Sequence, residues 1–154
     1  MKKNILISLL FFGLLNWALA QPALRKAQFN IDKKTIAVSG YDVVSYFTLG
    51  KAVKGSSSYA VAAEGVLYYF SSQINKDIFL KDWKKYEPQY GGWCAYAMGA
   101  SGEKVEVDPE TFKIINGKLY LFYHSWVNNT LTKWNKDETN LKTNADKNWA
   151  VFIK

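Results

Sequence analysis

The fold is organised around residues 85–99, which read KYEPQYGGWCAYAMG and contain the only cysteine of the chain. The proline disfavours helix early in this stretch, and the Gly-Gly pair allows a sharp turn before a new element begins. From residue 93 to residue 100 a short helix is allowed, and on it Cys94 and Met98 share one face because they are four residues apart. We therefore expect any chemistry of the protein to lie here.

Two β-hairpins are predicted on either side of this stretch. Their strands are residues 59–63 with 66–70, and residues 112–115 with 118–123. The second hairpin has the stronger signal, because both residues of its Asn-Gly turn tolerate positive φ. Hairpins without βαβ units indicate a single small α+β domain, with an antiparallel sheet and helices packed on it.

Helices are expected after each hairpin. Ser72 is a suitable N-cap for a helix over residues 73–81. The polar segment from about residue 125 to residue 148 predicts one or two further helices that pack on the sheet. The spaced apolar residues expected to anchor them are Trp126, Leu131, Trp134 and Leu141.

The first twenty residues have the pattern of a secretory signal peptide. Two lysines precede an apolar run, and residues 18–20, Ala-Leu-Ala, fit the small-x-small cleavage rule. The run is shorter than the roughly 20 residues that a membrane span needs, although a retained anchor is the alternative. We expect cleavage after Ala20, a periplasmic or secreted protein and no membrane span after cleavage. Residues 21–35 then form an N-terminal lead-in, and residues 36–154 form the domain with its C-terminal helical segment.

The charge of the predicted mature chain is moderately positive. Without Lys2 and Lys3, 18 of the 20 basic residues remain against 13 acidic ones, which gives a net charge of +5. The lysines are dispersed, so they favour solubility and a mild attraction to anionic surfaces rather than nucleic-acid binding. We expect a metal ion or a small ligand as partner, and no nucleic acid.

Three side chains suggest a site for a soft metal. Thiolate, thioether and imidazole together suit copper, especially Cu(I), and the candidate ligands are Cys94, Met98 and His124. The first two can share a helix face, and the histidine ends a predicted strand that can meet that helix. The alternative is that the sulfur-containing residues fill the core and the histidine lies at the surface.

A small-ligand pocket is a second candidate. One carboxylate and several aromatic side chains could line it: Tyr41, Asp42, Tyr46, Trp93 and Tyr96. In the alternative, the carboxylate caps a local turn and the tyrosines pack the core with their hydroxyls in water.

A thiol-dependent enzyme is the third possibility. A nucleophilic Cys94 needs an imidazole within hydrogen-bond reach and a third group to orient it, for which Asp42 or Asp108 could serve. The sequence has no Cys-x-x-Cys motif, which excludes a thioredoxin-type redox cycle within one chain. We expect burial to keep the thiol unreactive, which favours a binding module over an enzyme.

Several motifs occur in the order found in YHS domains. They are residues 65–72 (GVLYYFSS) with Phe79, Asp82, Lys85 and Tyr86 after them, residues 40–47 (GYDVVSYF), residues 91–95 (GGWCA) and residues 117–121 (GKLYL). From about residue 36 to residue 135 the chain resembles secreted bacterial YHS domain-containing proteins. Such domains are thought to bind metal through paired cysteines, but Ser71 and Asn75 stand at those positions here.

The resemblance therefore implies a secreted binding module, with any metal site resting on Cys94 and its neighbours. A thiol-dependent enzyme, or a structural or interaction protein without a small ligand, are the alternatives.

Overall fold

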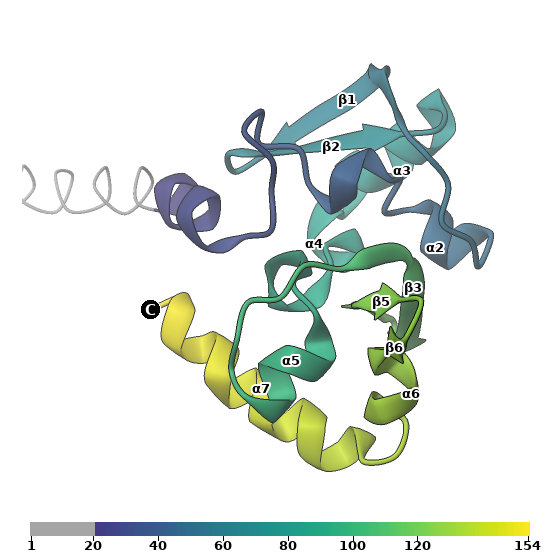
Figure 1. Cartoon of the computed structure of the whole chain (residues 1–154). Helices are drawn as coiled ribbons and strands as arrows, with labels where there is room; N and C mark the ends of the chain where they lie inside the picture. The colour runs from purple at the N-terminus through teal and green to yellow at the C-terminus, as the bar shows by residue number, and fades with distance from the viewer. Residues whose placement is uncertain (1–20) are drawn as a thin grey trace, which may run out of the picture.

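The computed structural model describes residues 21–154, so the predicted signal peptide and its cleavage site lie outside the described residues. The helices are α2 (Ser45–Thr48), α3 (Gln73–Lys81), α4 (Trp83–Tyr86), α5 (Ala95–Ala100), α6 (Thr130–Trp134) and α7 (Glu138–Phe152), with the 3-10 turns η1 (Val38–Gly40) and η2 (Gln89–Gly92). The strands are β1 (Ser56–Ala63), β2 (Val66–Phe70), β3 (Asp108–Ile115), β4 (Lys118–Phe122), β5 (His124–Ser125) and β6 (Asn128–Asn129). Antiparallel hairpins surrounded by helices confirm the predicted α+β class (Figure 1).

The strands are distributed over three two-stranded sheets, β1-β2, β3-β4 and β5-β6. Isolated bridges join some strands to segments outside the hairpins, such as the parallel bridge of Leu119 in β4 with Pro88, which precedes η2. Proline has no backbone N–H to donate, so this contact cannot grow into a regular ladder. The β1-β2 and β3-β4 hairpins are separate sheets, and side chains of both pack in one hydrophobic cluster.

Both predicted hairpin turns are present. Glu64 and Gly65 have φ values of 44° and 85°, and Asn116 and Gly117 have φ values of 50° and 71°. Two successive residues with positive φ give the type I′ geometry, whose twist matches that of the flanking strands. The predicted helix over residues 73–81 is also confirmed, because the Ser72 side chain accepts a hydrogen bond from the backbone N–H of Asn75 at its start.

Strand β4 is buried on both faces and separates two hydrophobic clusters. Leu119 and Leu121 pack into one cluster with residues of β2 and α3, whereas Tyr120 and Phe122 pack into the other cluster with residues of α5 and α6. Because side chains of a strand alternate between its two faces, one short strand holds both halves of the molecule together. Figure 1 shows the β1-β2 hairpin at the upper end, and α5 and α7 at the lower end.

Helix α5 packs directly on α7. A Cβ atom added to Gly99 would lie 2.3 Å from the carbonyl oxygen of Leu141, so only glycine allows this approach. The helix begins at Ala95, two residues later than predicted, and Cys94 takes the N-cap position.

Within residues 21–154, the helices are all too short or too polar to cross a membrane.

Residues 21–28 form a helix, which corrects the expectation of a loose lead-in. Arg25 of this helix is 8% exposed, and its Nη1 atom donates to Glu87 Oε2 at 2.9 Å. The guanidinium also lies 4.4 Å from the ring centre of Phe29, and the hydroxyl of Tyr68 donates to the same Glu87 carboxylate. This partly buried ion pair, with these contacts, attaches the N-terminal helix to the domain.

Candidate functional site

Cys94 and Met98 are both fully buried near the start of α5. The Cys94 sulfur accepts a hydrogen bond from the backbone N–H of Tyr123 at 3.3 Å and lies 3.4 Å from Thr130 Oγ1. His124 Nδ1 instead contacts Asp108 Oδ2, at 3.3 Å. In the described part of the chain, no group of three His, Cys, Asp or Glu side chains is arranged to hold a metal ion.

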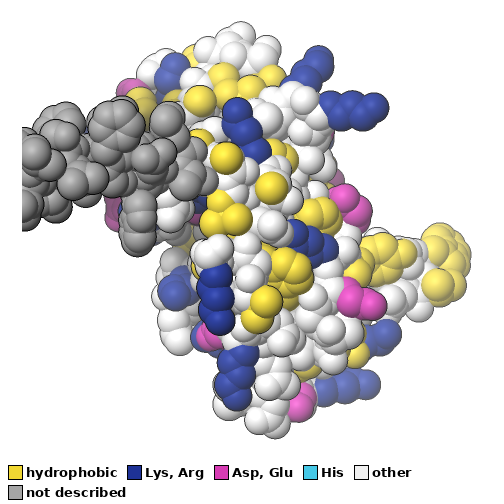
Figure 2. Space-filling model, turned by 90° about the vertical axis from the view of Figure 1, so that its left-hand side faces the viewer, with side chains coloured by type: hydrophobic (Ala, Val, Ile, Leu, Met, Phe, Trp, Pro, Cys, Tyr) yellow, Lys and Arg dark blue, Asp and Glu magenta, His cyan; other side chains and the backbone are white. Residues whose placement is uncertain are grey.

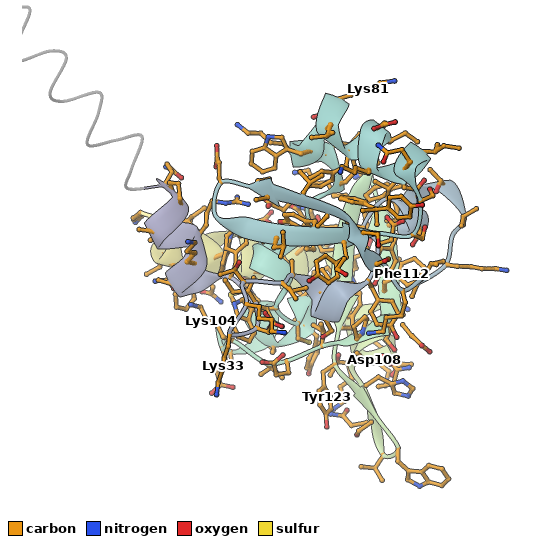
Figure 3. The ribbon with its side chains drawn as sticks, turned by 90° about the horizontal axis from the view of Figure 1, so that it is seen from above. Lys33, Lys81, Lys104, Asp108, Phe112 and Tyr123 are labelled. Carbon is orange, nitrogen blue, oxygen red and sulfur yellow. The ribbon has the colours of Figure 1, made fainter. Side chains whose placement is uncertain are left out.

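The segment between the two contacts of Cys94 is a projecting hairpin, residues 124–129, which we call the finger. Its strands β5 and β6 pair His124 with Asn129 and Ser125 with Asn128. Figure 3 shows the finger extending away from the body of the molecule beyond Tyr123, and Figure 2 shows hydrophobic side chains at the end of this projection.

Two apolar side chains occupy the tip of the finger. Trp126 is 100% exposed and Val127 is 88% exposed. The prediction that Trp126 anchors a helix on the sheet is therefore wrong. The helix begins only at Thr130, and Trp126 lies in the preceding turn, which points away from the core.

The root of the finger is closed by Tyr123 on one side and Thr130 on the other. The backbone N–H and the hydroxyl of Thr130 both donate to the Tyr123 carbonyl, at 3.0 and 2.8 Å. The Cys94 sulfur contacts both of these residues. The side chain of Asn129 caps the first turn of α6 by accepting a hydrogen bond from the N–H of Leu131. The thiol thus holds the two ends of the finger together and takes part in the structure of the root.

A second contact fixes the finger from its side. Asp108, which binds His124, also accepts from the Thr111 hydroxyl at 2.8 Å and from the Glu110 N–H at 3.0 Å. These donors hold the carboxylate in place beside His124 Nδ1. With Glu110 two residues away, the base of the finger carries two acidic side chains on a chain with net positive charge.

Asp42, a residue of the expected pocket, is fully buried and has its hydrogen-bonding capacity used within the fold. Its Oδ2 atom accepts from the Ser71 N–H at 2.8 Å, the Ser71 hydroxyl at 2.6 Å and the Asn75 amide at 2.7 Å. Its Oδ1 atom accepts from the Val44 N–H at 2.9 Å. A buried carboxylate with this many donors connects the segment before α2 to the start of α3.

Of the four aromatic residues of the expected pocket, Tyr41 and Tyr46 reach neighbouring residues of β3, whereas Trp93 and Tyr96 lie elsewhere. The Tyr46 hydroxyl donates to the Pro109 carbonyl, and burial raises the pKa of Tyr46 above its ordinary range. The Tyr41 hydroxyl donates to Glu110 at the base of the finger, whereas Trp93 Nε1 donates to the carbonyl of residue 28. Tyr96 packs against the cluster of α5, α6 and α7. The structure does not bring these side chains around one cavity.

Two hollows were not indicated by the sequence. The first, of about 280 Å³, includes Arg25, Glu87 and Trp149 in its lining. The second, of about 450 Å³, lies beside η1 and is lined by Asp32, Ile36, Ser39, Gly40, Lys54, Gly55 and Tyr69. We refer to the second as the η1 hollow.

Sequence reasoning missed the finger because the segment from about residue 125 to residue 148 was interpreted as one or two helices packing on the sheet. The signal that could have revealed it is the run HSWVNN, in which the apolar pair stands between polar residues without helical spacing. No family model, curated protein or solved structure matches the chain.

Proposed function

We propose that the protein is a non-enzymatic binding module that recognises its partner through the finger. The observation that carries the proposal is the full exposure of Trp126 at the tip of a hairpin. The root of this hairpin is held by hydrogen bonds of Tyr123 with Cys94 and Thr130. Tryptophan is among the residues that contribute most binding energy at protein interfaces, because one ring buries a large apolar area with few rotatable bonds. A short hairpin with a fixed root presents that ring with little loss of conformational freedom.

The surroundings of Cys94 favour a binding module over a thiol enzyme. A nucleophilic cysteine requires a base within hydrogen-bond reach, whereas this sulfur contacts an amide N–H and a hydroxyl. The imidazole of His124 contacts Asp108 instead. The thiol also has no exposed surface through which a substrate could approach.

Two features of the sequence support a role outside the cytoplasm. The resemblance to secreted YHS domain-containing proteins is consistent with a small binding module, and the signal-peptide pattern of residues 1–20 is consistent with export. We include periplasmic or secreted localisation in the proposal.

Site-specific cross-linking tests the role of the finger. A photoreactive amino acid is placed at position 126 and, as a matched control, at Ile74, which is 71% exposed on α3. After illumination of the cells that produce the protein, we expect a discrete adduct from position 126 and none from position 74. Equal adducts from both positions, or none from either, would contradict the proposal.

A soft metal ion such as copper is the second candidate ligand. The observation that favours it is that Met98 lies one helical turn from Cys94, while His124 directly follows the residue whose N–H contacts the sulfur. Binding would require the sulfur and the imidazole to exchange their present hydrogen bonds for the metal.

Thermal unfolding with and without Cu(I) tests this candidate. If it is correct, Cu(I) raises the melting temperature of the protein, and the variants Met98→Leu and His124→Asn each reduce the rise. A melting temperature that does not respond to Cu(I) would exclude the site.

A further inference from the structure

The finger and the η1 hollow lie close to each other on one side of the molecule. Tyr41 connects them, because its hydroxyl donates to Glu110 at 3.1 Å and Lys54 Nζ, from the hollow, lies 4.0 Å from its ring centre. Figure 3 shows Lys33, which follows the hollow residue Asp32, on the same side as Asp108 and Tyr123. A projection and a concave site thus share one face.

The two sites also differ in the sign of their charge. The base of the finger has Asp108 and Glu110, whereas Lys54 lines the hollow and the exposed pair Lys33 and Lys34 directly follows the lining residue Asp32 in the chain. Asp32 is the acidic residue of the hollow, and its carboxylate accepts hydrogen bonds from the N–H groups of residues 34 and 36. With these three lysines against Asp32, the hollow and the residues next to it carry net positive charge, and the finger base is negative.

We propose that two copies of this chain associate about a two-fold axis, with the finger of each copy in the η1 hollow of the other. A two-fold interface brings each patch of one copy against the complementary patch of its partner, so a projection and a hollow on one face are used twice. Trp126 would pack on Tyr69 and Ile36 in the hollow, while the acidic finger base meets Lys54. This inference rests on the proposed role of the finger and names its partner.

The contact is expected to be weak and reversible. A tryptophan side chain buries about 150–250 Å², and two fingers with their bases give an interface below the roughly 1,200 Å² of the smallest stable complexes. The charge pairs at the rim are exposed, so they set the orientation and add salt dependence rather than much affinity. The protein should therefore be monomeric when dilute and dimeric when concentrated.

Sedimentation equilibrium of the purified protein, from about 10 µM to about 1 mM, measures this association. We expect a monomer–dimer equilibrium that Trp126→Ser weakens about tenfold or more. The matched control Ile74→Ser removes an exposed apolar side chain from α3 and should leave the equilibrium unchanged. A protein that remains monomeric throughout, or a Trp126→Ser variant that associates normally, would overturn the proposal.

A charge exchange tests the orientation of the two copies. Lys54→Glu and Glu110→Lys should each weaken self-association, because each places like charges at both contacts. Mixing the two variants should restore association, since both contacts then pair opposite charges. Failure of the mixture to associate, with both variants folded by their melting curves, would rule out the two-fold arrangement.

The outcomes also separate this inference from the proposed function. A cross-link from position 126 to a second copy of the chain supports both. A cross-link to a different protein, or preferential labelling of lipids, from a protein that sediments as a monomer supports a binding finger and overturns self-association.

Discussion

Asp42 and Trp126 represent the two extremes of exposure in this molecule, 0% and 100% respectively. The carboxylate of Asp42 is the group that could bind a ligand or exchange a proton. Its oxygens, however, already accept hydrogen bonds from the backbone of Val44 and Ser71 and from the side chains of Ser71 and Asn75. The indole ring is apolar and has no packing partner within the fold. The comparison teaches that a reactive residue type indicates a functional site only where its hydrogen bonds remain available.

The largest expected effect is the loss of the buried carboxylate. Asp42→Ala leaves the donors of Ser71, Asn75 and Val44 without an acceptor in a site closed to water, and we expect a loss of about 3 to 5 kcal/mol in the free energy of unfolding. Chemical denaturation measures it. Asp77→Ala, which removes an exposed carboxylate from α3, is the control and should change the value by less than about 0.5 kcal/mol. A small effect of Asp42→Ala would mean that water or a ligand reaches this site.

Buried phenols should make the protein unstable in alkali. Burial, followed by the nearby Glu87 carboxylate, raises the pKa of Tyr68, and burial likewise raises the pKa of Tyr46 and of Tyr90. Above pH of about 10 the unfolded chain releases these protons and the folded chain keeps them, so unfolding becomes more favourable as the pH rises.

Each retained phenol proton lowers the free energy of unfolding by about 1.4 kcal/mol per pH unit in this range. Tyr68→Phe should remove the contribution of one phenol proton from the pH dependence of the free energy of unfolding. Denaturation at several pH values can measure this change. Absorbance titration should show the buried phenols ionising only together with unfolding. Ionisation of all ten tyrosines near pH 10 in the folded protein would contradict this burial.

Cys94 should contribute through the root of the finger. Cys94→Ala removes the acceptor of the Tyr123 N–H and leaves a small cavity, for an expected loss of about 1 to 3 kcal/mol. Cys94→Ser keeps an acceptor and should cost less. Amide hydrogen exchange of residues 124–129 should accelerate more than that of β1-β2 in the alanine variant. Rapid alkylation of the native thiol near neutral pH would instead support the enzyme hypothesis.

The elements defined by local chemistry were predictable. The Asn116-Gly117 turn and the Ser72 cap follow from residues a few positions apart, and both are present in the structure. The separation of the hairpins into three sheets was not predictable, because it depends on which faces of β4 pack on which cluster. Nor was the N-terminal helix, because the burial of Arg25 depends on Glu87, 62 residues away.

The candidate site shows the same limit. Cys94 and His124 were selected for their chemistry; Cys94 contacts the root of the finger, and His124 is the first residue of the finger and contacts Asp108 at its base. Their partners, Thr130 and Asp108, become neighbours only through the hairpin register, which sequence spacing does not specify. Trp126 was missed because an apolar residue in a polar segment is usually an anchor for a helix, and only the structure shows a turn at that position.

The smallest expected change in the free energy of unfolding is that of Trp126, the residue on which the proposed function depends. Measuring this change is the most direct test of the account. Chemical denaturation of dilute Trp126→Ser should give a free energy of unfolding within about 0.5 kcal/mol of the unsubstituted protein, since a fully exposed side chain leaves no cavity when it is removed. An unchanged denaturant dependence should accompany it. A loss above about 1 kcal/mol would contradict the account, because it would mean that Trp126 packs against the body of the protein and is not free to bind a partner.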